Sequence, residues 1–163
     1  MSERKPRTFF ARPEGGVHLR IWFAKAGKNA KEEGISPLPE QHFANGTYSF
    51  SLTDFNPIGL TQEQAVEAGK EGSLFKGYGA QFGTQVWRMA HEAKVGDYVF
   101  LESENHHLHA VGYVSGAYSR MSEDEAMTPD GLAKQGIHRI PVHWIPIANG
   151  RDLIQLGRLD NAV

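Results

Sequence analysis

The sequence predicts an α+β domain built on a small curved β-sheet with helices on its flanks. Two observations carry this expectation. Short strand-like runs are separated by short helical segments along the whole chain, which is typical of a mixed α+β domain. One pair of neighbouring runs, residues 98–102 and the segment up to about residue 114, is spaced as a hairpin. No internal repeat or low-complexity tract is present.

Composition predicts a single soluble domain and excludes several kinds of chemistry. The chain has 163 residues, of which 40% are hydrophobic and 22% charged, enough to bury one core. No apolar run approaches the roughly 18 residues needed to cross a bilayer, and the N-terminus lacks a secretory pattern. Because the chain has no cysteine, it can form no disulfide, thiol nucleophile or cysteine-bound zinc. We therefore expect a cytoplasmic protein with no membrane partner.

The charges are divided unevenly along the chain. Residues 1–31 hold eight basic and two acidic side chains, a net charge of +6, whereas the remainder carries −8. Such asymmetry can make a positive face that contacts phosphate, although the whole chain has a net charge of −2. A solvated basic arm with no ligand is the other interpretation. Both stay open at this point.

The first half of the chain predicts two strands and two short helices. Residues 17–23 follow a Gly-Gly turn signal and mix β-branched with aromatic side chains, so we expect a strand followed by a basic turn. Ser36-Pro37 and Asn45-Gly46 bound a short helix over residues 37–44. Residues 47–52 alternate apolar and polar side chains, which is the period of a half-buried strand. Thr61 and Gln64 make a capping-box pattern, and Gly69 is expected to end that helix.

The second half predicts an amphipathic helix and three strands. Apolar residues recur every three or four positions over residues 80–94, giving one buried stripe. The hairpin strands follow the Gly96-Asp97 turn, and a polar segment over residues 115–136 precedes a last strand at residues 139–147. Pro141 and Pro146 lack an amide hydrogen, so we expect this strand to be an edge or barrel-closing strand.

Five short motifs in a fixed order resemble the EVE-like specificity domains of modification-dependent restriction systems, both McrB-type and HNH-fused. The matching segments are Val86-Trp87-Arg88 with His91-Glu92, Gly96-Asp97, residues 110–118, His138-Arg139 and Val142-His143-Trp144. The first predicted strand and its basic turn, residues 21–27, also resemble those domains, whereas Phe50-Ser51-Leu52 stands where they often carry Ile-Gly-Trp. RNA-binding YTH modules are similar more loosely.

The resemblance implies a PUA-like curved sheet or pseudo-barrel of five to six strands, flanked by helices. It implies a basic arm at residues 1–16, a modified-base-binding domain at 17–147, and a tail or linker toward an effector domain at 148–163. Its function would be to recognise 5-methylcytosine, 5-hydroxymethylcytosine or N6-methyladenine in DNA by flipping the base into an aromatic pocket. A separate nuclease or GTPase domain or subunit would then act on the DNA.

Two sets of site residues follow from this resemblance. We expect the base-binding pocket to comprise Trp22, Phe50, Ser51, Leu52, Asp54 and Tyr118. We expect the nucleic-acid backbone to be contacted by Arg7, Lys25, Lys28, Arg120 and Arg139. The alternative interpretation is structural. The aromatic and apolar residues would then pack in the core, and the basic residues would be solvated on the surface.

The sequence gives less support to other functions. No catalytic residue, cofactor or metal is expected, because the chain lacks a Gly-rich phosphate loop, a nucleophile elbow and a carboxylate pair suited to catalysis. The His106-His107-Leu108-His109 run offers too few ligands for closed zinc coordination. Two alternatives to a DNA reader remain: a YTH- or ASCH-like module that binds modified RNA, and a PUA-like domain that binds another kind of ligand.

Overall fold

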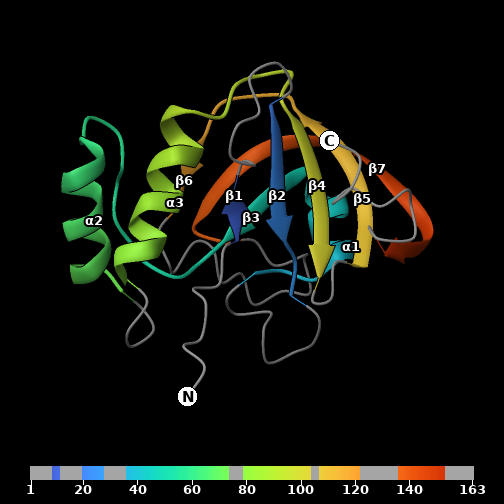
Figure 1. Cartoon of the computed structure of the whole chain (residues 1–163), viewed down its shortest axis with the longest axis horizontal. Helices are drawn as coiled ribbons and strands as arrows, with labels where there is room; N and C mark the ends of the chain where they lie inside the picture. Colours follow the sequence, from blue (N-terminus) through green and yellow to red (C-terminus); the bar gives the residue numbers. More distant parts are fainter. Residues whose placement is uncertain are drawn as a thin grey trace.

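A computed structural model describes residues 9–11, 20–27, 36–73, 79–103, 107–121 and 136–152. It confirms the α+β class, with three helices and a curled mixed sheet (Figure 1). The elements in chain order are β1 (Phe10–Ala11), β2 (Ile21–Lys25), α1 (Pro39–Asn45), β3 (Thr47–Phe50), α2 (Gln62–Glu71), α3 (Gly79–His91), β4 (Tyr98–Ser103), β5 (His107–Val114), β6 (Ser119–Arg120) and β7 (His138–Asp152).

The strands form one sheet in the order β1-β2-β4-β5-β7-β3, and β6 pairs with β7 beside this path. The pairing of β2 with β4 is parallel, and the other pairings are antiparallel. The described part of the chain therefore has seven strands, whereas five to six were expected. The strands that were not expected are β1 and β6, which contain only two residues each. Such short strands leave no periodic signal in a sequence.

Strand β7 joins the two parts of the sheet. Its first residues pair with β3 on one side and β6 on the other, and from Val142 onward it pairs with β5. The prediction of an edge strand is therefore wrong, because β7 lies inside the sheet between β5 and β3, and the alternative of a barrel-closing strand stays a prediction. In Figure 1 it appears as the long orange-red band that sweeps behind the other strands. Residues 148–152, assigned above to a tail, belong to this strand.

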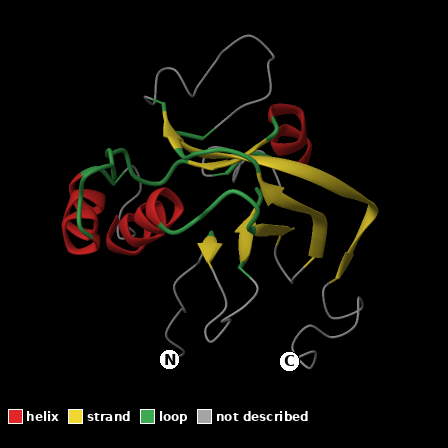
Figure 2. Ribbon diagram, turned by 90° about the horizontal axis from the view of Figure 1, so that it is seen from above, coloured by secondary structure: helices red, strands yellow, loops and turns green. Residues whose placement is uncertain are grey.

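Helix α1 begins at Pro39, two residues after the predicted start, and ends at Asn45 before Gly46 as the sequence indicates, whereas α2 begins as predicted after Thr61. In α2, Thr61 Oγ1 accepts a hydrogen bond from the Gln64 amide at 3.2 Å, and Gln64 Oε1 accepts one from the Thr61 amide at 2.9 Å, which confirms the capping box. The helix continues past Gly69 to Glu71, so the predicted end is wrong. Figure 2 shows α2 and α3 together on one side of the sheet and α1 on the other. None of the described helices is long and apolar enough to span a bilayer.

Stacked aromatic rings fill the core under β1, β2 and β3. Phe10 lies parallel to Trp22 with ring centroids 4.5 Å apart, and Tyr48 lies 5.7 Å from the same Phe10 ring. Trp22 also donates its indole hydrogen to Asp97 Oδ2 at 3.0 Å. Phe9 and Phe10 come from the range 1–16, for which the sequence predicts a basic arm, and both are buried. Their burial removes apolar surface from water, which ties β1 to the sheet.

Candidate functional site

Serine hydroxyl groups hold the end of β3 and the residue after it against the two residues that precede β7. Ser49 Oγ accepts a hydrogen bond from the Gly136 amide at 2.7 Å, and Ser51 Oγ accepts one from the Ile137 amide at 2.9 Å. A Cβ on Gly136 would collide with the main chain of Phe50, so only glycine allows this approach. Ser51, which was expected to touch a ligand, thus positions with Ser49 the chain that carries His138.

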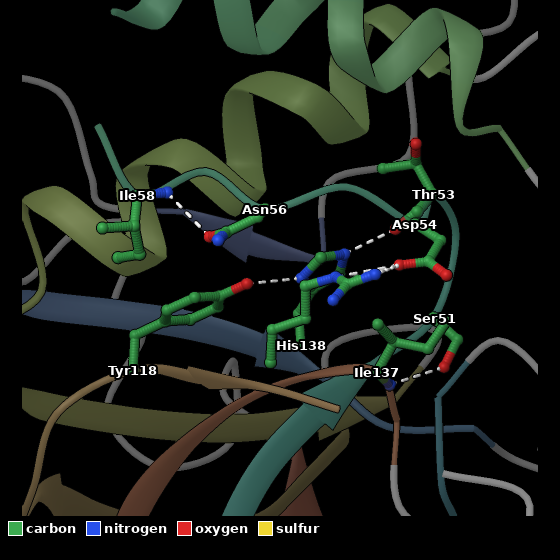
Figure 3. A network of polar contacts seen from close by, with 9 residues as sticks. Ser51, Thr53, Asp54, Asn56, Ile58, Tyr118, Ile137 and His138 are labelled. Carbon is green, nitrogen blue, oxygen red and sulfur yellow. Dashed lines mark hydrogen bonds and ion pairs between the residues drawn. The ribbon is translucent and has the colours of Figure 1, made fainter. Parts of the chain in front are cut away.

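His138 occupies the centre of this region (Figure 3). Its imidazole is fully buried between Phe50 and Phe55, with ring centroids 5.9 and 5.8 Å away. One ring nitrogen, Nε2, lies 2.5 Å from the Thr53 carbonyl oxygen, and the other, Nδ1, lies 2.7 Å from the Tyr118 hydroxyl. Burial lowers the pKa of His138 to about 4, and burial also raises the pKa of Tyr118. Both side chains are therefore neutral near pH 7.

Asp54 and Arg120 form an ion pair beside the imidazole. Arg120 donates from Nε and Nη2 to the same oxygen, Asp54 Oδ1, at 2.9 and 2.5 Å. The side chain of Asp54 is 25% exposed and that of Arg120 is 34% exposed, so solvent reaches both. Arg120 lies opposite His138 in the pairing of β6 with β7, and Phe50 lies opposite His138 on β3. This register brings residues 54 and 120 together across the sheet.

Helices α2 and α3 hold the loop that carries Asp54. The Asp54 amide donates to the Gly72 carbonyl at 2.8 Å, and Thr53 Oγ1 donates to the Gly69 carbonyl at 2.7 Å. Farther along the loop, Trp87 Nε1 of α3 donates to the Leu60 carbonyl at 2.8 Å. The backbone at Asp54 is therefore fixed by hydrogen bonds rather than left to solvent. We call Ser51, Asp54, Tyr118, Arg120 and His138 the Tyr118 site.

Three of the predicted pocket walls lie in the core instead. Trp22 and Phe50 are fully buried and Leu52 is 2% exposed. Phe10 already covers a face of Trp22, so that ring cannot receive a base without repacking of the core. The expectation of an open pocket lined by these side chains is corrected for this structure. Tyr118 is the half-buried aromatic member of the predicted set.

The predicted phosphate contacts are also divided. Arg120 lies in the Tyr118 site, whereas Arg139 is 9% exposed and its Nη2 contacts Met121 Sδ and the Gly136 carbonyl. Arg139 is therefore directed inward and is corrected as a phosphate contact. Lys25 lies at the end of β2, opposite Glu102 of β4, and is partly exposed. Arg7 and Lys28 fall outside the described residues.

The sequence predicts no site role for His138, although His138-Arg139 is one of the matching motifs. The available signal was an ionisable side chain beginning a strand whose following residues are largely apolar. Such a side chain is buried only with hydrogen-bond partners, and these come from residues 53 and 118, far away in the sequence. A single sequence does not reveal that pairing.

Other parts of the described structure are weaker candidates for a functional site. His107 and His109 lie together on β5, with ring centroids 4.8 Å apart, but the described residues contain no cluster of three potential metal ligands. Two surface hollows lie along α2, lined in part by Glu63, Glu67 and Glu71. Their acidic lining repels phosphate, so neither hollow suits nucleic acid.

Comparisons with known proteins add little to this geometry. No protein-family model matches the chain, and no curated protein shows significant similarity to it. One solved structure that is similar is the YTH domain of the Zygosaccharomyces rouxii MRB1 protein in complex with N6-methyladenosine RNA. The match has a TM-score of 0.34 and 16% identity, and covers 85% of this chain and 67% of that chain. A likeness this distant carries no argument about function.

Proposed function

We propose that this domain recognises a modified base in nucleic acid through the Tyr118 site. In this proposal it is a binding module and not a catalyst, and it directs a nuclease or GTPase carried by another domain or subunit. The preferred ligand is duplex DNA in which the modified base has turned out of its stack. The assignment of DNA and of an effector rests on the sequence resemblance.

The observation that carries the proposal is the convergence of two predicted segments on one partly exposed surface. Asp54 and Tyr118 come from segments about 60 residues apart in the sequence. Tyr118 contacts the buried His138, and Asp54 accepts a hydrogen bond from Arg120, which lies beside it. The surface combines an aromatic ring with a cation, a carboxylate and a hydroxyl. Those are the groups that stack on a base and form hydrogen bonds with its edge.

The energies involved are compatible with this role. Turning a base out of a duplex costs a few kcal/mol. Stacking on Tyr118 would return about 1 to 3 kcal/mol, and burying one methyl group adds on the order of 0.8 kcal/mol. Stacking and methyl burial therefore nearly offset extrusion, and hydrogen bonds to the base edge supply the discrimination.

Replacement of Tyr118 tests the proposal. We expect Tyr118→Ala to lower the ratio of affinities for modified and unmodified duplexes, measured by fluorescence anisotropy with duplexes that differ in one base modification. Tyr113→Ala is the matched control, because Tyr113 is a 41% exposed tyrosine on β5 outside the Tyr118 site. Equal binding of every modified and unmodified duplex by the native protein would refute base recognition.

Competition between polymers separates DNA from RNA. A duplex DNA and a single-stranded RNA of the same modified sequence are mixed as competitors for the native protein. Only the duplex must be opened before its base enters the site, so a DNA reader must recover that cost through contacts with the duplex. Preference for the duplex supports the DNA assignment, and preference for the RNA supports the alternative.

A further inference from the structure

The direction of the hydrogen bonds around His138 is fixed by a carbonyl group. The Thr53 carbonyl oxygen can only accept, so the Nε2 atom of His138 must carry the hydrogen that it donates across 2.5 Å. Burial lowers the pKa of His138 to about 4, so the ring carries only that hydrogen near pH 7. Nδ1 is consequently a bare acceptor.

This arrangement decides how the Tyr118 hydroxyl is oriented. The hydroxyl has one hydrogen, and the acceptor Nδ1 lies 2.7 Å from its oxygen. Tyr118 therefore donates that hydrogen inward to His138. What its oxygen can offer to a ligand is lone pairs, so in this state Tyr118 is an acceptor toward the outside.

Asp54 presents the same polarity on the other side of the imidazole. Its Oδ1 accepts both hydrogen bonds from Arg120, and no described residue donates to Oδ2. The ionised carboxylate has no hydrogen to donate. Figure 3 shows the hydroxyl of Tyr118 and the carboxylate of Asp54 on either side of His138.

We propose that the Tyr118 site selects an amino base, cytosine or adenine with its modification, over the corresponding keto base, and that His138 is the positioning residue that imposes this choice. This inference rests on the proposed function. An exocyclic amine donates hydrogen to the fixed acceptors, whereas a keto oxygen would place its lone pairs against theirs. His138 acts through Tyr118 and touches no ligand.

The pair 5-methylcytosine and thymine tests the selection, because at position 4 one carries an amine and the other a keto oxygen. Each base is placed opposite an abasic position in the same duplex, so neither has a pairing partner to lose. For the native protein we expect binding of 5-methylcytosine about tenfold tighter than binding of thymine, corresponding to roughly one hydrogen bond. Equal affinities, in a protein that still prefers 5-methylcytosine to cytosine, would overturn the inference and leave the proposed function standing.

Variants then separate positioning from packing. Tyr118→Phe removes one of the two fixed acceptors and leaves Asp54, so it should lower the ratio of 5-methylcytosine to thymine affinities below that of the native protein. His138→Leu removes the acceptor of the tyrosine hydrogen, so the freed hydroxyl can donate to a keto oxygen and the ratio should fall likewise. His138→Asn keeps a carbonyl acceptor on the β7 side and should retain part of the preference.

The outcome does not depend on any single variant being well folded. Circular dichroism and thermal unfolding identify the variants that fold, and Tyr118→Phe is a small change at a half-buried position. A folded Tyr118→Phe protein with the native ratio of affinities would contradict the inference. Equal binding of modified and unmodified duplexes by the native protein, for modified cytosine and modified adenine alike, would instead refute the proposed function.

Discussion

At the scale of single residues, burial separates the side chains that hold the fold from those that can meet a ligand. Trp22 and Tyr118 are both aromatic residues that the resemblance assigns to the pocket. Trp22 is fully buried and its indole is bonded to Asp97, whereas Tyr118 is half-buried at the edge of β6. The residue type alone could not distinguish these positions, because aromatic rings serve both purposes.

Replacement of Trp22 by phenylalanine checks this separation. Trp22→Phe removes one of the hydrogen bonds that Asp97 Oδ2 accepts and leaves the one from the Lys94 amide, and the loss should cost about 1 to 3 kcal/mol of unfolding free energy. Urea denaturation measures this loss. The ratio of affinities for modified and unmodified DNA should remain native in the folded fraction. A variant of native stability that has lost the ratio would show that Trp22 contacts the base.

The buried histidines predict a dependence of stability on pH. Burial lowers the pKa of His138 to about 4 and that of His42 to about 3, below the ordinary value of 6.5. Between about pH 4 and 6.5 the unfolded chain binds protons that the native rings do not, so unfolding becomes easier as the pH falls. Each ring should contribute about 1.4 kcal/mol of unfolding free energy per pH unit in that window.

Urea denaturation at several pH values from 7 to 4.5 measures this slope. His138 and His42 together contribute part of the slope of unfolding free energy against pH, and His138→Gln should remove about half of that contribution. The control His143→Gln replaces an exposed imidazole and should leave the slope unchanged. A slope that is the same with and without His138 would show that this ring is protonated in the native state.

At the scale of elements, periodicity and capping signals located the long helices and the hairpin. The pattern over residues 80–94 corresponds to α3, and the Thr61–Gln64 capping box begins α2 as expected. The two-residue strands β1 and β6 were missed because their positions are set by partners distant in sequence. The same reason explains why β7 extends beyond its predicted range: His107 of β5 pairs with Asp152.

The predicted end of α2 at Gly69 was wrong for a related reason. Glycine often ends a helix, but Gly69 lies inside α2 and accepts a hydrogen bond from Thr53 Oγ1 through its carbonyl, whereas Gly72 allows the close approach of Asp54. In the same way, the polar residues at 51–54 were found from the sequence, whereas their link to His138 and Arg120 required the register of β3, β6 and β7.

Gly72→Ala tests the contact between α2 and the site. The added Cβ would overlap the main-chain oxygen of Asp54, so the loop or the helix end must move. We expect a loss of about 1 to 3 kcal/mol of unfolding free energy, together with weaker binding of modified DNA. Thermal unfolding and anisotropy measure the two effects. The control Glu71→Ala changes an exposed residue at the same helix end, and an equal effect of both substitutions would count against a specific contact.

At the scale of the whole molecule, the uneven charge distribution predicts a strong effect of salt on binding. Arg7 and Lys28 belong to the basic first 31 residues and remain predicted phosphate contacts. Each contact that is lost should lower the slope of log affinity against log salt concentration by about 0.9 for duplex DNA. We therefore expect the double substitution Arg7→Ala and Lys28→Ala to reduce this slope by nearly two.

Lys70→Gln is the control for that experiment, since Lys70 is an exposed lysine on α2 that pairs with Glu67. It should leave the slope unchanged. Titration of one modified duplex at several salt concentrations measures all three proteins. A double variant with the native slope would show that Arg7 and Lys28 do not contact phosphate, as expected for a solvated basic arm with no ligand.

The position of β7 also determines when the Tyr118 site can exist during protein synthesis. Ser49 and Gly136, which hold β3 to the start of β7, are separated by 87 residues. A ribosome adds roughly 5 to 20 residues per second, so β3 leaves the exit tunnel several seconds before its partner. During that interval β3 lacks its pairing strand, because its partner in the sheet is β7. The Tyr118 site is therefore among the last parts of the nascent domain to form.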